Sequence, residues 1–235
     1  MHIFLTLILG WVVTVQAEPC KVKNDPSAWV DALGTPFEAQ RDYLVALKHC
    51  LDADPEMQAY TDEQWLMFYQ GLEHDDSLTA SQKEGMTRWL TLILMQNAAA
   101  GYASSQHNLA VTFNAPADSL LAKAMPQDME KFIYWTRKAA AQKEPRALFN
   151  LSMRYLYGLP EAGVPQDTEM AYVLLKGALV EVDKLEGKDS RTDEMHAAYK
   201  PFADKMCKAL NPAKCAELAS LVSEFNFGVL DPELD

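Results

Sequence analysis

A short sequence that occurs twice in the chain constrains its fold more than any other feature. Pro126-Gln127-Asp128 and Pro165-Gln166-Asp167 lie 39 residues apart, and each opens a stretch with helical periodicity. Three later positions also match: Glu130 with Glu169, Arg137 with Lys176, and Ala139 with Ala178. Repeats of this length and patterning form helical hairpins that bury their apolar sides against their neighbours. The sequence therefore predicts an all-α fold, a stack of antiparallel helical hairpins.

Helix signals occur along most of the chain. It has only ten glycines, and no stretch alternates apolar and polar residues as a strand would. Thr79 and Gln82 fit a capping box. Pro126 and Pro165 suit a first helical turn, which would place Asp128 and Asp167 near a positive helix end. Pro201 predicts a kink or break. We expect helices at residues 79–100, 104–113, 126–142, 145–157, 165–186, 190–210 and 212–225, and a longer connection at 115–125.

The first 17 residues resemble a secretory signal peptide. Residues 3–15 are mostly apolar and carry no charged side chain, and Val15-Gln16-Ala17 has the small residues typical of a cleavage site. The alternative is an uncleaved anchor, but the run is shorter than the roughly 20 apolar residues that a membrane-spanning helix needs. We therefore expect export with no stable membrane insertion.

Residues 18–235 are expected to form one helical-repeat domain, because no low-complexity linker divides them. Within that domain we expect N-terminal capping helices at 18–85, the repeats at 86–184 and a capping helical hairpin with an acidic tail at 185–235. The tail itself, residues 229–235, is expected to fray.

Four cysteines occur, and they fall into two pairs near opposite ends of the chain: Cys20, Cys50, Cys207 and Cys215. Export would permit disulfides, and four cysteines allow three connectivities. Proximity in the sequence favours Cys20–Cys50 and Cys207–Cys215. A zinc site would need C-x-x-C spacing or nearby histidines, and the cysteines have neither, so no metal is expected.

Charge excludes one class of function. The chain has 33 acidic and 21 basic residues and a formal net charge of −12. A nucleic-acid-binding protein would normally carry a basic stripe. The negative balance favours solubility or a basic partner.

Each unit also carries matching small, aromatic and basic positions. The first unit contains Asn108-Leu109, Trp135 and Arg137-Lys138-Ala139-Ala140; the second contains Ala147, Asn150-Leu151, Tyr155, Gly158 and Ala171. Over about residues 86–183 these units resemble the Sel-one-like repeat, a relative of the tetratricopeptide repeat. The departures from that pattern are Ala110 and Ser152 at glycine positions, Phe132 at a small position, Leu174 at a tryptophan position and Lys143 at the closing glycine.

The resemblance implies a tetratricopeptide-like solenoid, with capping helices at both ends, that binds another protein. In such stacks the first helix of each unit lines the concave groove, which nominates Gln106, His107, Arg146, Phe149 and Arg154 as partner-binding residues. Exported bacterial proteins of this kind include periplasmic immunity proteins that inhibit a type VI secretion effector, often a lipase. We therefore expect a periplasmic immunity protein that binds a secreted toxin. The alternatives are a general envelope scaffold or adaptor, and a signalling regulator.

No constellation in the sequence indicates an enzyme or a cofactor. Glu73-His74-Asp75-Asp76 lacks the spacing of a calcium loop and is expected to be a solvated turn. Ser104 and His107 lie close in sequence, but no nucleophile elbow or orienting carboxylate accompanies them. An exported hydrolase that acts on the cell wall is the alternative of a different class.

Overall fold

The computed structural model describes residue 69 and residues 71–185 and 192–233. Every regular element in these ranges is a helix, and the one extended pairing is an isolated bridge between Leu159 and Val164. The prediction of an all-α chain is therefore confirmed for this part. The expected signal peptide, Cys20, Cys50 and the helices expected before residue 69 lie outside the described residues.

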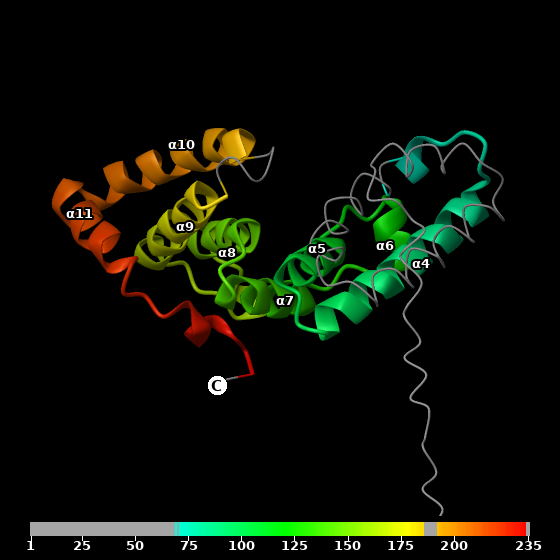
Figure 1. The fold of residues 1–235 in the computed structure, drawn as a ribbon, viewed down its shortest axis with the longest axis horizontal. Helices are drawn as coiled ribbons and strands as arrows, with labels where there is room; N and C mark the ends of the chain where they lie inside the picture. The colour runs from blue at the N-terminus through cyan, green and yellow to red at the C-terminus, as the bar shows by residue number, and fades with distance from the viewer. Residues whose placement is uncertain (1–68, 70, 186–191, 234–235) are drawn as a thin grey trace, which may run out of the picture.

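The described helices lie in a row that follows chain order, except that the short helix α6 lies beside α4 and α5 is followed in the row by α7. Helices α4 and α6 lie at one end of the row and α10 and α11 at the other (Figure 1). Most of the contacts between helices join neighbours along the chain. The bounds are α4 Ala80–Ala99, α5 Ala103–Phe113, α6 Leu120–Ala124, α7 Met129–Ala141, α8 Pro145–Tyr157, α9 Thr168–Asp183, α10 Thr192–Leu210 and α11 Pro212–Leu221, with 3-10 turns η1 Pro160–Ala162 and η2 Phe227–Leu230.

The two copies of the sequence repeat have the same local structure. Asp128 and Asp167 are the N-caps of α7 and α9, with φ near −150° in both (−153° and −149°). Each carboxylate accepts a hydrogen bond from the third amide of its helix, at 3.0 and 2.9 Å. Each backbone N–H donates back to the preceding long helix, to the Phe113 carbonyl at 2.9 Å and the Tyr155 carbonyl at 2.7 Å. The sequence repeat is thus a repeat of structure.

These caps correct the expected helix starts. Helices α7 and α9 begin at Met129 and Thr168, not at Pro126 and Pro165. The physical reason is that Asp128 and Asp167 adopt an extended backbone conformation and accept a hydrogen bond from an otherwise unpaired amide of the first turn. Each helix therefore begins after its aspartate, and the proline two residues before the aspartate lies outside the helix. The capping box at Thr79 is confirmed, since the Thr79 N–H donates to the Gln82 side chain at 2.9 Å.

Two further expectations are narrowed. Of the kink or break expected at Pro201, the break does not occur, because α10 runs through this residue. Both Pro201 and Ala197, whose carbonyl loses its helical donor, are exposed, so water can supply the missing bond. The connection at 115–125 contains the short helix α6, which Ser119 caps by accepting from the Ala122 N–H at 3.1 Å.

Small residues let the helices approach closely. Six alanines of the two units are fully buried: Ala110, Ala139, Ala140, Ala147, Ala171 and Ala178. Where α8 meets α9, the Ser152 hydroxyl donates to the Ala171 carbonyl at 2.7 Å. A larger side chain at either position would separate the two helices.

The end of the chain is not frayed as far as Glu233. After α11 the chain turns back, and η2 packs against α7 (Figure 1). Phe227 and Leu230 are buried, so this segment has its own apolar anchors and does not behave as a free acidic tail.

Candidate functional site

Helix α8 carries three of the five nominated partner-binding residues, and its first turn is held by a buried carboxylate. Glu144 is the N-cap of α8, and its side chain accepts a hydrogen bond from the Ala147 N–H at 2.7 Å. It also accepts one from Arg146 Nε at 2.6 Å. Both oxygens are therefore bonded, which a buried carboxylate requires.

Arg146 links this cap to the preceding hairpin. Its guanidinium donates to the Ser104 hydroxyl at 3.0 Å and to the Asn108 side chain at 3.4 Å, both on α5. His107, also on α5, has Nδ1 at 4.0 Å from the Glu144 carboxylate. We call Ser104, His107, Asn108, Glu144 and Arg146 the polar seam. It joins α5 to α8 through directional bonds.

The charge state of Glu144 follows from this setting. Burial raises the pKa of Glu144, but the positive charges of Arg146 and His107 and the hydrogen bonds to the carboxylate together lower it below its ordinary value of 4.5. Glu144 is therefore ionised at neutral pH, and Arg146 is its closest counter-charge at 2.6 Å.

Gln106 and His107 are buried and do not form part of an exposed groove. The Gln106 side chain donates to the Ala98 carbonyl at 3.1 Å and accepts from the Gln142 side chain at 2.8 Å. His107 is 5% exposed. Helix α5 lies between α4 and α7, so its polar side chains face protein on two sides. This corrects the expectation that both residues line an open surface.

The other three nominated residues lie on α8 and are half-buried. Phe149 stacks on Tyr199 of α10 with ring centroids 4.2 Å apart, and Phe202 meets it edge-on at 5.8 Å. We call these three rings the aromatic seam. The Arg154 guanidinium lies over the Phe132 ring, 4.9 Å from its centroid.

Helical spacing extends this surface to residues that the sequence did not nominate. Asn150, Met153 and Tyr157 fall on the same side of α8 as Arg146 and Arg154, and Tyr157 is 65% exposed. The available signal was the composition of α8, which has two arginines and no acidic residue in a chain of net charge −12. The α8 face consists of Arg146, Phe149, Asn150, Met153, Arg154 and Tyr157.

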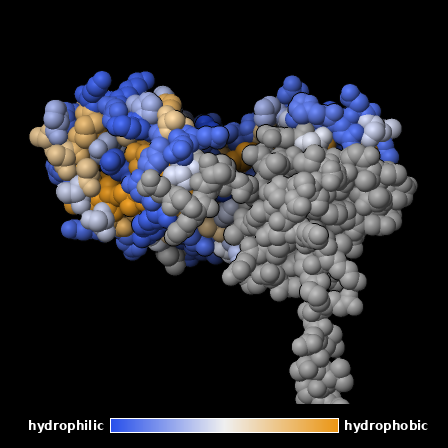
Figure 2. All heavy atoms as spheres, turned by 45° about the horizontal axis from the view of Figure 1, so that its top comes forward, coloured by the Kyte–Doolittle hydropathy of each residue, from blue (hydrophilic) through white to orange (hydrophobic). Residues whose placement is uncertain are grey.

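The α8 face is not the only apolar surface. In Figure 2, apolar residues gather at the end of the molecule that carries α10 and α11, between hydrophilic borders. Val180 and Leu221 are exposed apolar residues on other helices, α9 and α11. Residues such as Tyr, Met and Arg are enriched in protein interfaces, and this composition distinguishes the α8 face.

Two of the side chains considered for chemistry, Asp75 and Ser104, form hydrogen bonds within the fold. Asp75 accepts hydrogen bonds from the Ser77 N–H at 2.9 Å and the Ser77 hydroxyl at 2.6 Å, which closes a turn. Ser104 accepts a bond from Arg146. Among the described residues, no three or more His, Cys, Asp and Glu side chains are placed to hold a metal ion.

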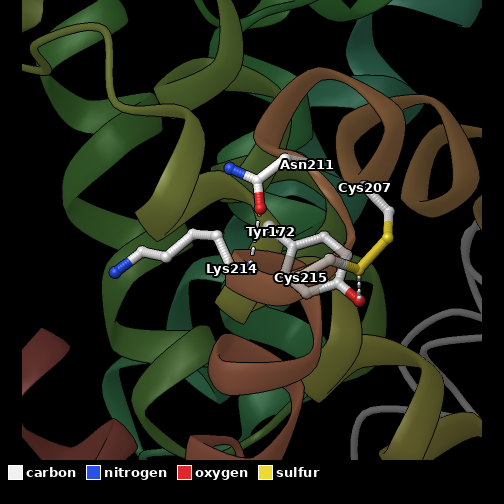
Figure 3. The surroundings of a disulfide bond; sticks show 5 residues. All are labelled: Tyr172, Cys207, Asn211, Lys214 and Cys215. Atoms are coloured by element: carbon white, nitrogen blue, oxygen red, sulfur yellow. Dashed lines mark hydrogen bonds between the residues drawn. A yellow bond between two sulfur atoms is a disulfide. The ribbon is translucent and has the colours of Figure 1, made fainter.

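The disulfide predicted near the C-terminus is present and joins α10 to α11 (Figure 3). The Cα atoms of Cys207 and Cys215 are 5.2 Å apart. The Tyr172 hydroxyl lies 3.0 Å from Cys215 Sγ. Because a disulfide sulfur has no hydrogen, the Tyr172 O–H is the donor and the sulfur is the acceptor. Burial, and secondarily the charge of Asp204, raises the pKa of Tyr172, so the hydroxyl stays protonated. Asn211 caps α11 by accepting from the Lys214 N–H at 3.0 Å.

The chain was compared with protein-family models, curated proteins and solved structures, and it matches none of them. In the described ranges, no helix combines the length and the apolar content that crossing a bilayer requires.

Proposed function

We propose that the chain is an exported helical-repeat protein that binds another protein along the α8 face. The observation that carries the proposal is that the two units have the same local structure. Asp128 and Asp167 cap their helices in the same way, and the backbone N–H of each donates to a carbonyl at the end of the preceding long helix. Repeated units that contact their neighbours in chain order form extended surfaces, and such surfaces typically hold proteins.

The finer fold that we propose is a tetratricopeptide-like solenoid of the Sel-one-like type. One departure from that pattern supports it. Lys143 stands at the closing glycine position and has φ of 64°, a conformation in which glycine is favoured. The serine and alanine at the other glycine positions, Ser152 and Ala110, are fully buried. A glycine-like backbone at Lys143 and buried small side chains at Ser152 and Ala110 support the proposed repeat type.

Export to the periplasm is part of the proposal. A disulfide between Cys207 and Cys215 is expected to persist in an oxidising compartment and to be rare in the cytosol. This supports the secretory interpretation of the N-terminal sequence.

The most specific form of the proposal is an immunity protein that binds and inhibits a type VI secretion effector. A stack cross-linked by side-chain networks and a disulfide is rigid, and a rigid surface loses little entropy on binding. Half-buried aromatic and arginine side chains on α8 supply the kind of anchors on which tight interfaces depend.

Co-purification with any secreted effector that a neighbouring gene encodes tests the proposal. We expect Tyr157→Ala together with Arg154→Ala to weaken effector binding by about tenfold or more. Val180→Ala and Leu221→Ala are matched controls, because they remove exposed apolar side chains elsewhere. Inhibition of the effector by a stoichiometric amount of the chain supports immunity. Binding without inhibition supports a scaffold, and binding unaffected by both α8 substitutions contradicts the α8 face.

A further inference from the structure

The segment after α11 holds onto the body of the protein through three side chains at regular spacing. Phe227, Leu230 and Glu233 are three residues apart. Phe227 and Leu230 are 4% and 7% exposed, whereas Val229 between them is 58% exposed. Phe227 is therefore the aromatic anchor of the segment, Leu230 the aliphatic anchor and Glu233 the acidic anchor. The Val229 side chain extends into solvent.

The aromatic anchor occupies a space that a missing side chain creates. Gly177 lies within α9, and a Cβ atom placed there would be 2.5 Å from Cζ of the Phe227 ring. The Lys143 ammonium lies 5.8 Å from the centroid of the same ring. Glycine in a helix interior is unfavourable, so this one has a packing purpose.

The acidic anchor binds two side chains of α7. Glu233 accepts a hydrogen bond from the Tyr134 hydroxyl at 2.5 Å and pairs with the Lys138 ammonium at 2.7 Å. We call Tyr134, Lys138, Lys143 and Gly177 the tail seat. Its two lysines give it a positive charge that complements the acidic residues of the tail, Asp231 and Glu233.

The tail is held by two buried apolar side chains, Phe227 and Leu230, and by one exposed ion pair. The Glu233 side chain is 60% exposed, and exposed ion pairs contribute little to stability. The regular structure of the tail is one short 3-10 turn of four residues. Release of the tail exposes two apolar side chains and leaves the helices in place, so it costs less free energy than unfolding of the whole protein.

We propose that the tail seat is a peptide-binding site that the chain covers with its own tail. The partner that fits is an acidic protein segment with an aromatic residue, an aliphatic residue three positions later and a carboxylate three positions after that. Such a segment displaces the tail and gains the same contacts. This site is separate from the α8 face and does not depend on the function proposed for it.

A labelled peptide of residues 224–235 tests the site by fluorescence anisotropy. We expect saturable binding to a chain truncated after Ser223, and binding about tenfold weaker or more to the full chain, whose own tail competes. Gly177→Ala fills the space for the ring and should abolish peptide binding to the truncated chain. Lys138→Glu should weaken it by about tenfold or more, because the carboxylate then meets a like charge.

Matched controls keep the test independent of folding. Gly85→Ala changes a glycine within α4 that has open space around it, and it should leave peptide binding unchanged. Tyr157→Ala on the α8 face should also leave it unchanged. If the truncated chain does not fold, the full chain with Phe227→Ala and Leu230→Ala releases the tail instead and should bind the peptide as the truncated chain would.

Several outcomes would overturn the proposal. One is the absence of saturable binding to a folded tail-released chain, and another is binding that survives Gly177→Ala. Peptide binding to the full chain that stays undetectable at about a thousand times the concentration that saturates the truncated chain would show that the tail is not displaced. A concentration-dependent dimer that disappears on truncation would make a second copy of this chain the occupant in place of a foreign partner.

Discussion

The polar seam and the aromatic seam solve the same packing problem with different physical chemistry. Both hold α8 against another helix: the polar seam holds it against α5, and the aromatic seam holds it against α10. The polar seam uses hydrogen bonds from Arg146 to Ser104 and Asn108, and the ion pair with Glu144 at the start of α8 holds the Arg146 guanidinium in place. These directional bonds permit one register, and loss of Arg146 leaves a costly buried charge on Glu144. The aromatic seam uses ring area, which tolerates small shifts. The comparison predicts that only the polar seam responds to pH.

The largest effect should follow Arg146→Met, which keeps most of the side-chain volume and removes the charge. Glu144 then remains buried without its main partner, and breaking a buried pair in this way costs about 3–5 kcal/mol. Urea unfolding at neutral pH measures the loss. The double variant Glu144→Gln with Arg146→Met should recover part of it, because no buried charge remains. A loss below about 1 kcal/mol for Arg146→Met would show that the pair is not the main constraint.

Acid should reduce the difference in unfolding free energy between the native chain and Arg146→Met. The pKa of Glu144 lies below its ordinary value of 4.5, so the ionised carboxylate stabilises the fold above that value. This stability is lost as the pH falls through the folded-state pKa. The gap in unfolding free energy between the native chain and Arg146→Met should therefore shrink between pH 7 and pH 3. A gap that stays constant over this range would contradict an ionised Glu144.

Phe149→Ala should cost less, about 2 kcal/mol. Full burial of a phenylalanine would make the loss roughly 3–5 kcal/mol, but this ring is half-buried. The loss should be the same at pH 7 and pH 4, because Phe149, Tyr199 and Phe202 carry no charge in this range. Phe149→Leu should recover part of the stability by restoring apolar area. An acid-dependent loss for Phe149→Ala would remove the distinction between the two seams.

The smallest effects should come from the caps that the two units share. Asp128→Ala and Asp167→Ala should each lower the free energy of unfolding by about 1 kcal/mol, and by similar amounts. Asp128 also pairs with Lys131 at 2.9 Å, but that lysine is exposed and adds little. Asp→Asn at either position retains an oxygen acceptor and serves as the control. Thermal unfolding that differs by more than about 1 kcal/mol between the two alanine variants would show that the units are not equivalent.

Local patterns predicted the helices well because the forces that start and stop them act within a few residues. The capping box at Thr79 and the start of α8 at Pro145 follow directly from such patterns. The starts of α7 and α9 were wrong by three residues, because aspartate and proline both favour a helix start and the aspartate cap prevailed.

The sites were harder to predict because their partners are distant in sequence. Asn108 and Arg146 are 38 residues apart. No sequence pattern near His107 or Asn108 indicates that an arginine packs against them. The family resemblance places the first helix of each unit along the groove, so α5 was expected to present Gln106 and His107 there, whereas both side chains are buried. The tail seat had one usable signal, the isolated Gly177 within a helix, but the ring that fills its space comes from beyond α11.

The bridge between Cys207 and Cys215 has a consequence for proteolysis. The segment that it encloses contains Lys208 and Lys214, and Lys208 is exposed, so trypsin can cleave there. Cleavage would leave α11 and everything after it attached to the larger fragment through sulfur. A chain cut only at Lys208 should then migrate as one band without a reductant and as two with one, and the sulfur link would keep the tail available to its seat after the backbone is cut.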